Sequence, residues 1–169
     1  SSPGVSVIDT LNGVVFAPVV AKPSPDTLRG FGYADQGPSA QQSFVVAATI
    51  SSPLGIKAPA HYEISLASDG TGFTDSLTLQ PVMGIAKDSV ASTSVYIRLK
   101  GGLTAGTYNE IVTVSSMAAT SKLVNCFGTV TSPFINNPIP STLNGVSLVY
   151  GYGAGPSATK NFTVNAINL

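Results

Sequence analysis

Residue types that could carry acid–base or nucleophilic chemistry are sparse in this sequence. His61 is the only histidine, so neither a pair of histidines acting as acid and base nor a metal site built on several histidines can form. A serine–histidine–aspartate set would have to use His61, and the alternation of residues 61–66 indicates that it faces solvent. Glu63 shares that face, and Glu110 stands alone in another strand pattern. We therefore expect no catalytic residue and no enzyme activity.

Patterns for binding a metal ion or a phosphate group are equally weak. The stretch SDGTGFTD (68–75) could place Asp69 and Asp75 near a calcium ion, but it lacks the ligand density of calcium loops. The glycine-rich stretches GYADQG (32–37) and YGYGAG (150–155) do not precede a helix, which argues against phosphate binding. The sequence thus predicts no metal and no cofactor.

Cys126 is the only cysteine, which excludes an internal disulfide and a cysteine-based zinc cluster. No basic neighbour is present to lower its pKa, so we expect a small, buried, apolar side chain rather than a reactive thiol.

Composition and charge narrow the class of protein further. Eight basic and eight acidic residues cancel, and only 9% of the chain is charged. This balance favours neither nucleic acid nor an anionic membrane as a partner. The longest apolar stretch, 13–21, is too short to span a bilayer and contains Pro18, so no direct membrane insertion is expected. No signal peptide is recognisable at the N-terminus, so a secreted protein would be represented here in mature or fragment form.

The elements that must position these residues are predicted to be strands. Gly and Pro are abundant, with 17 and 12 copies, and no segment has a helical period. Alternating or β-rich segments separated by turn residues occur at 43–49, 61–66, 76–82, 94–100, 111–116 and 122–130. Short strands at this spacing predict an all-β fold, an immunoglobulin-like antiparallel β-sandwich. Tyr108, which follows the turn GLTAG and opens a strand, matches the tyrosine corner of such sandwiches, in which the hydroxyl binds backbone across a connection.

The chain also repeats itself. Shifted by 115 residues, positions 1–30 match 116–145 at ten of thirty positions, including Gly13, Pro18, Pro23 and Pro25. After a shift of three further residues, GPSAQQSFVV (37–46) matches GPSATKNFTV (155–164). Matched Gly and Pro have specific backbone roles, so chance is a poor explanation.

This self-similarity predicts three parts of a tandem repeat. Residues 1–20 are interpreted as the C-terminal tail of a preceding Ig-like repeat, residues 21–133 as one complete repeat, and residues 134–169 as the N-terminal head of a following repeat. Proline-rich joints at 17–25 and 132–140 are expected to stiffen the connections.

Five segments together carry a family resemblance: GPSAQQSFVV, IKAPAHYEISL, FTDSLTLQPV, STSVYIRLKGGLTAGTYNEIVTVSS and ATSKLVNCFGTV. The sequence resembles a recurrent Ig-like repeat of large secreted and cell-surface proteins from Bacteroidota. The resemblance implies secretion by the type IX route, display in long tandem arrays, and no catalysis.

Four of the six aspartates begin Asp–Ser/Thr–aliphatic triplets, which resemble the O-glycosylation sequon of exported Bacteroidota proteins. The implied acceptors are Thr10, Thr27, Ser76 and Ser89. Ser141 replaces the aspartate before Thr142, so no glycan is expected there. The alternative is that these triplets only mark turns at strand ends.

These observations lead to one functional prediction and one alternative. We expect a structural stalk, spacer or fibre segment of an extracellular, cell-surface protein, whose partners are neighbouring Ig-like repeats of the same or an identical chain. The alternative is an adhesion or carbohydrate-binding module that contacts surface glycans. Its candidate contact residues are the aromatic side chains that flank the same turn in two copies: Tyr33, Tyr150 and Tyr152.

Overall fold

The computed structural model describes residues 16–34, 36–84, 87–117, 119–132 and 134–135, together with Asn161, Thr163, Ala166 and Ile167. Over these residues the chain forms strands and no helix. The strands are β1 (Val19–Val20), β2 (Thr27–Tyr33), β3 (Gln42–Thr49), β4 (Leu54–Lys57), β5 (Tyr62–Ser65), β6 (Ser76–Leu79), β7 (Ser89–Leu99), β8 (Gly106–Ser115), β9 (Lys122–Val130), β10 (Phe134–Ile135) and β11 (Ala166–Ile167).

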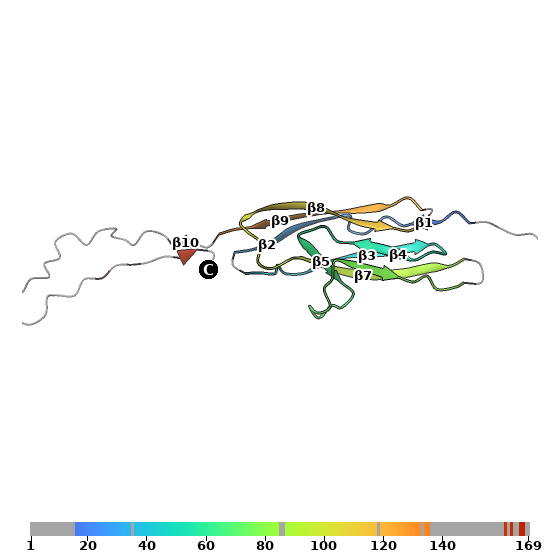
Figure 1. Ribbon diagram of the computed structural model, residues 1–169, viewed down its shortest axis with the longest axis horizontal. Coiled ribbons are helices and arrows are strands. Elements are labelled where there is room, and N and C mark those ends of the chain that lie inside the picture. Colours follow the sequence, from blue (N-terminus) through green and yellow to red (C-terminus); the bar gives the residue numbers. More distant parts are fainter. Residues whose placement is uncertain are drawn as a thin grey trace, which may run out of the picture.

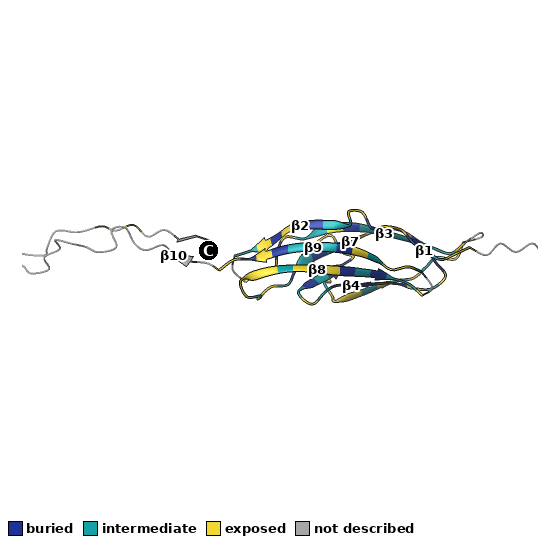
Figure 2. Ribbon diagram, turned by 90° about the horizontal axis from the view of Figure 1, so that it is seen from above, coloured by how far each residue is buried: buried dark blue, intermediate teal, exposed yellow. Residues whose placement is uncertain are grey.

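Two sheets face each other and confirm the predicted all-β sandwich (Figure 1). One sheet has the order β1-β3-β7-β5, and the other has the order β2-β9-β8-β4-β6. Among the described residues, β10 and β11 pair with each other in a separate two-stranded sheet. Figure 2 shows buried residues alternating with more exposed ones along the strands, as period-two patterning requires when one face of a sheet is covered.

The pairing of β2 with β9 is parallel, whereas every other pairing of named strands is antiparallel. The prediction of an antiparallel sandwich therefore misses one pair. The cause is that the entering chain first pairs with β3 as β1 and then crosses to the other sheet as β2. There it runs in the same direction as β9, the last strand of the sandwich.

The sandwich begins earlier than the complete repeat drawn from the sequence. Val19 and Val20, which the sequence assigned to the tail of a preceding repeat, pair with Thr49 and Ala48 of β3. Val20 is only 2% exposed and belongs to the core. The repeat boundary in the sequence and the first core strand therefore overlap by two residues.

β2 is a strand that alternation does not reveal, because a bulge interrupts it. The register to β9 shifts between Arg29 and Phe31, and Gly30 adopts a positive φ of 81° there. Glycine accepts this conformation without steric cost. As a result Leu28 and Phe31, three positions apart, both point into the core.

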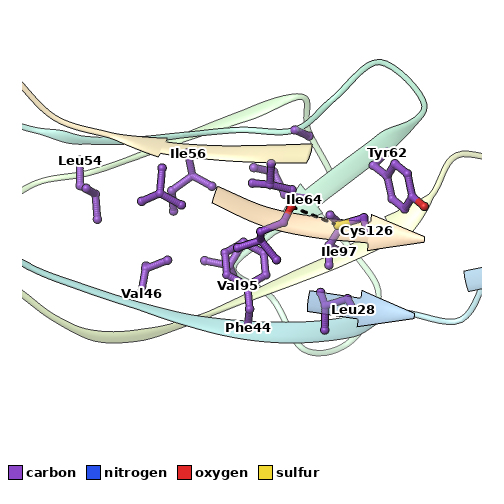
Figure 3. Packing of buried hydrophobic residues seen from close by; sticks show 14 of the residues in the cluster. Leu28, Phe44, Val46, Leu54, Ile56, Tyr62, Ile64, Val95, Ile97 and Cys126 are labelled. Atoms are coloured by element: carbon purple, nitrogen blue, oxygen red, sulfur yellow. Dashed lines mark hydrogen bonds between the residues drawn. The ribbon is translucent and has the colours of Figure 1, made fainter. Parts of the chain in front are cut away.

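The largest fully buried side chain of the described core is that of Tyr62, which lies at one end of the cluster near Cys126 (Figure 3). Its ring meets Phe31 edge-on at 5.2 Å between centroids, and its hydroxyl donates to the backbone oxygen of Tyr108 at 2.8 Å. Burial raises the pKa of the Tyr62 phenol well above its usual value. The hydroxyl of a β5 residue is thus bonded to β8 of the opposite sheet.

Cys126 is fully buried in the same core, which confirms the expectation from the sequence. Burial raises the pKa of its thiol to about 12, and the nearby charge of Glu110 adds to that effect. At neutral pH the side chain is therefore a neutral thiol.

Gly128 on β9 leaves the space through which Tyr62 passes. A Cβ atom at this position would lie 2.6 Å from Cδ1 of Leu99 and 2.7 Å from the Tyr62 hydroxyl. Side-chain approaches this short force repacking of the buried neighbours, so any side chain here is costly.

We predict that Gly128→Ala lowers the free energy of unfolding by about 1–3 kcal/mol, because it overpacks the core beside Tyr62. Chemical denaturation of the variant and the wild type measures this change. Gly55→Ala is the matched control, since its Cβ would meet nothing closer than 3.7 Å. Equal stability of Gly128→Ala and the wild type would contradict this account of the core.

Candidate functional site

Side chains that could bind a ligand or take part in catalysis lie at the end of the sandwich where the chain leaves it. We call this end the C-terminal pole and define it by the loops 36–41, 58–61 and 100–105. Backbone bonds hold the loops together: Gly102 donates to Gln36 at 2.7 Å, and Lys100 donates to His61 at 2.9 Å. The pole therefore has a fixed backbone on which its side chains are mounted.

His61 and Glu110 form an ion-pair geometry at this pole. Nδ1 of His61 lies 2.6 Å from Oε1 of Glu110, and the backbone N–H of His61 donates to Oε2 at 3.1 Å. The His61 ring also lies 4.8 Å from the ring of Tyr108, centroid to centroid. The expectation that His61 faces solvent holds only in part, since 42% of its side chain is exposed. The expectation that Glu110 stands alone is wrong, because β8 brings it to His61.

The arrangement orients His61, and over the described residues no hydroxyl is bonded to its second ring nitrogen. Both carboxylate oxygens of Glu110 are engaged by one residue, and the Tyr108 hydroxyl is bonded elsewhere. A serine–histidine–carboxylate relay needs a hydroxyl on the second ring nitrogen. What the geometry does provide is a brace between the 58–61 loop and β8.

Tyr108 forms the predicted tyrosine corner. Its hydroxyl donates to the backbone oxygen of Thr104 at 2.7 Å, across the turn that precedes β8. Thr104 Oγ1 lies 3.3 Å from the same hydroxyl. The bond fixes the β7–β8 connection, which is the structural role that the sequence pattern indicated.

Tyr33 anchors the same connection from the other side. Its hydroxyl donates to the backbone oxygen of Lys100 at 2.7 Å and accepts from the backbone N–H of Leu103 at 2.9 Å. The ring also borders Gly37, where a Cβ would lie 2.6 Å from it. The polar tip that carbohydrate binding would use is therefore occupied by backbone. Tyr150 and Tyr152 lie outside the described residues.

Two further acidic side chains, Glu63 and Asp75, are paired with basic side chains. Arg98 donates to Glu63 at 2.7 Å and lies over the ring of Phe73, 3.8 Å from its centroid. Lys100 lies 2.7 Å from Asp75. In both pairs the carboxylate and the basic group contact each other, so neither charge is left unpaired for a ligand.

The stretch 68–75 does not assemble a calcium site. Asp69 accepts from the backbone N–H and the hydroxyl of Thr71 at 3.0 and 2.6 Å, and the hydroxyl bond is the main cause of its lowered pKa. Asp75 is turned toward Lys100 instead. Over the ranges that the structure covers, no group of three His, Cys, Asp or Glu side chains could hold a metal ion.

The Asp–Ser/Thr triplets occupy a shared structural position. Thr27, Ser76 and Ser89 are the first residues of β2, β6 and β7. Each preceding aspartate has a bonded partner: Lys22 lies 2.6 Å from Asp26, Lys100 lies 2.7 Å from Asp75, and the backbone N–H of Gly84 donates to Asp88. Ser76 is exposed, whereas Thr27 and Ser89 are half-buried. Thr10 lies outside the described residues.

Sequence patterns missed the His61–Glu110 and Tyr33 contacts because both are long-range. His61 and Glu110 are 49 positions apart, and Tyr33 and Lys100 are 67 apart. A signal was present for Tyr108, since a tyrosine corner closes over four residues of its own turn.

No family model and no curated protein matches the sequence. Among solved structures, the chain is similar to the CooA pilin subunit from enterotoxigenic Escherichia coli, with 10% identity and a TM-score of 0.38 over 69% of this chain and 98% of that one. It is also similar to the CupB6 tip adhesin from Pseudomonas aeruginosa, with 10% identity and a TM-score of 0.41 over 63% of this chain and 40% of that one. A third similarity is to the PapD-like domain 7 of human CEP192, with 9% identity and a TM-score of 0.33 over 77% and 97%. At TM-scores this low we draw no functional conclusion from them. In the part of the chain that the structure describes, no helix is long and apolar enough to cross a membrane.

We predict that Tyr108→Phe and Tyr33→Phe each lower the free energy of unfolding by about 0.5–1.5 kcal/mol, since each removes a hydroxyl bonded to backbone. Tyr33→Phe should cost more, because it leaves both the Lys100 oxygen and the Leu103 N–H without this partner. Thermal and denaturant unfolding measure both changes, with Tyr96→Phe, a half-exposed strand tyrosine, as the control. If neither variant differs from Tyr96→Phe, the hydroxyls do not brace the pole.

Proposed function

We propose that this chain is a segment of a tandem array of Ig-like sandwiches that serves as a stalk or spacer of a bacterial cell-surface protein. The observation that carries the proposal is the pairing of β10 with β11, which repeats the way the sandwich itself begins.

β10–β11 has the register of β1–β3. In the sandwich, Val19 pairs with Thr49 and Val20 with Ala48. In the small sheet, Phe134 pairs with Ile167 and Ile135 with Ala166. β10 lies 115 positions after β1, and Ala166 and Ile167 lie 118 positions after Ala48 and Thr49.

These two spacings are the offsets at which the sequence matches itself, and both pairings are antiparallel. The same pairing, a short entering strand beside a later strand, thus recurs after the sandwich has ended. This recurrence supports the interpretation of residues 134–169 as the head of a following repeat.

The path of the chain through the sandwich suits a linear array. Figure 1 shows β1 at one end of the sandwich and β9 running to the opposite end, toward β10. Each sandwich therefore receives the chain at one pole and passes it on at the other. Over the described residues, both large sheets and the buried core between them are built from residues 19–130.

The setting of this array is proposed to be extracellular. The proposal follows the resemblance to repeats of secreted Bacteroidota proteins, together with the Asp–Ser/Thr triplets placed at strand starts. Glycans at these positions would add hydration to a surface on which charged residues are scarce. Stiff proline joints between successive sandwiches would keep the array extended.

The tandem arrangement predicts that a second sandwich forms when the missing part is supplied. Leu169 corresponds to Ser51 at the offset of 118, so residues 52–133 of this chain are appended after Leu169. We expect a second set of exchange-protected amides and a denaturant m-value about twice that of the 169-residue chain if both sandwiches unfold together, because m scales with the surface exposed. Hydrogen exchange and urea titration measure these properties.

The control for this experiment joins residues 52–133 directly after Pro133, which omits the proposed head. The appended segment should then stay unprotected, since the strands equivalent to β1, β2 and β3 are absent. An appended segment that remains unprotected even behind the full 169 residues would contradict the tandem arrangement.

The O-glycosylation part of the proposal predicts modified Thr10, Thr27, Ser76 and Ser89 in protein taken from its natural source. Ser76 should carry the highest occupancy of the three described acceptors, because it is exposed at the start of an edge strand. Glycopeptide mass spectrometry measures occupancy. Thr142 is an internal control, since its Thr–Leu pair matches that of Thr27 but lacks the aspartate. Modification of Thr142 at the level of Thr27, or of none of the four acceptors, would refute the sequon.

A further inference from the structure

β2 and β9 are placed so that tension along the chain would load them together. They are adjacent and parallel, with six register pairs from Thr27–Asn125 to Tyr33–Val130. Two backbone bonds extend the ladder at its ends: Asn125 donates to Asp26 at 2.9 Å, and Thr131 donates to Tyr33 at 3.1 Å. The chain enters this pair at the start of β2 and leaves it at the end of β9.

In a parallel pair the entry and the exit lie at opposite ends. Pulling the two ends apart therefore slides one strand along the other, and the hydrogen bonds of the ladder must fail together. In an antiparallel pair of first and last strands, the entry and the exit would share one end, and the bonds would open one after another. The rate of forced unfolding depends on the height of the unfolding barrier, which is larger when several bonds break in one step.

The contacts on either side of the pair direct the load to β2–β9. The segment before β2 is held by β1 and by the Ser24–Val45 bridge, a much shorter ladder. On its other side β9 is paired with β8 along its whole length, from Lys122–Val114 to Val130–Gly106. Under tension the segment before β2 would detach first. The β2–β9 pair would then carry the load.

Side chains reinforce the pair on both faces. On the inner face Leu28, Phe31 and Cys126 are buried, which keeps water from one side of the ladder. On the outer face the guanidinium of Arg29 lies 4.1 Å from the ring centroid of Phe127, its register partner. The Tyr33 hydroxyl fixes the end of β2 to the 100–103 turn.

We propose that the β2–β9 pair is a force-bearing clamp, which makes each sandwich of the array resist extension. This inference rests on the proposed function, because a stalk or spacer is the setting in which tension reaches both ends of the chain. The clamp itself is a property of one sandwich and is tested on the 169-residue chain alone.

Single-molecule pulling from two pairs of attachment points tests the clamp. Handles on Lys22→Cys and Ser132→Cys load the ladder in shear, whereas handles on Lys22→Cys and Ser121→Cys pull the starts of β2 and β9 apart. At the same loading rate we expect the rupture force in shear to be about twice that in the other direction. In shear all bonds of the ladder carry the load together, so the unfolding barrier is higher. Equal rupture forces in the two directions would overturn the proposal. Cys126 stays in place, since its thiol is buried.

A pair of variants provides the second measurement, with end-to-end pulling. Asn125→Pro removes the N–H that donates to Asp26, and Thr78→Pro places a proline in edge strand β6, away from the clamp. Both lower equilibrium stability. We expect the rupture force of Asn125→Pro to fall to about half that of the wild type, because the β2–β9 ladder then has fewer bonds to break. The rupture force of Thr78→Pro should equal that of the wild type.

Equal losses of rupture force in the two variants would overturn the proposal. If Asn125→Pro does not fold, the comparison of pulling directions decides alone. Failure of the clamp leaves the extended-chain experiment unaffected, and failure of the second sandwich to form leaves the rupture force of the first unchanged.

Discussion

The buried hydroxyl of Tyr62 is the interaction on which the sandwich most depends. A phenol in an apolar core is tolerated only when its hydroxyl is bonded, and here it donates to the backbone of Tyr108 on the opposite sheet. The Tyr62 hydroxyl can extend to the Tyr108 backbone only because Gly128 has no side chain in its path. The two sheets are therefore joined by a directional bond as well as by aliphatic packing, and their relative position is fixed at the C-terminal pole.

The rest of this pole follows from that fixed point. Tyr108 accepts the bond from Tyr62 through its backbone and uses its own hydroxyl to close the turn before β8. Glu110, two positions on, holds the loop that carries His61. The polar side chains of Tyr62, Tyr108 and Glu110 are thus bonded to neighbouring side chains and backbone of the pole. The proposed spacer and the proposed β2–β9 clamp would both need such a pole, because load on the leaving chain would reach the sandwich through it.

Period-two patterns predicted most of the strands, and single positions explain where they failed. β4 was missed because Pro53 and Gly55, two positions apart, are residues typical of turns, although Leu54 and Ile56 both point into the core. β2 was missed because the bulge at Gly30 places Leu28 and Phe31 on one face at a spacing that no strand period contains. The parallel partner of β2 could not be predicted at all, since strand direction depends on how the entering chain crosses between sheets.

The sequence by itself determined the all-β class, the burial of Cys126, the corner made by Tyr108 and a self-match at offsets of 115 and 118 residues. These are local or periodic properties, which a linear pattern records directly. Only the tertiary structure decided that His61 contacts Glu110, that the Tyr33 hydroxyl is bonded to the backbone of a turn, and that β2 lies parallel to β9. Each of these joins residues from 49 to about a hundred positions apart. Contacts of that range depend on the order of strands in the two sheets, and no local preference of the residues involved encodes that order.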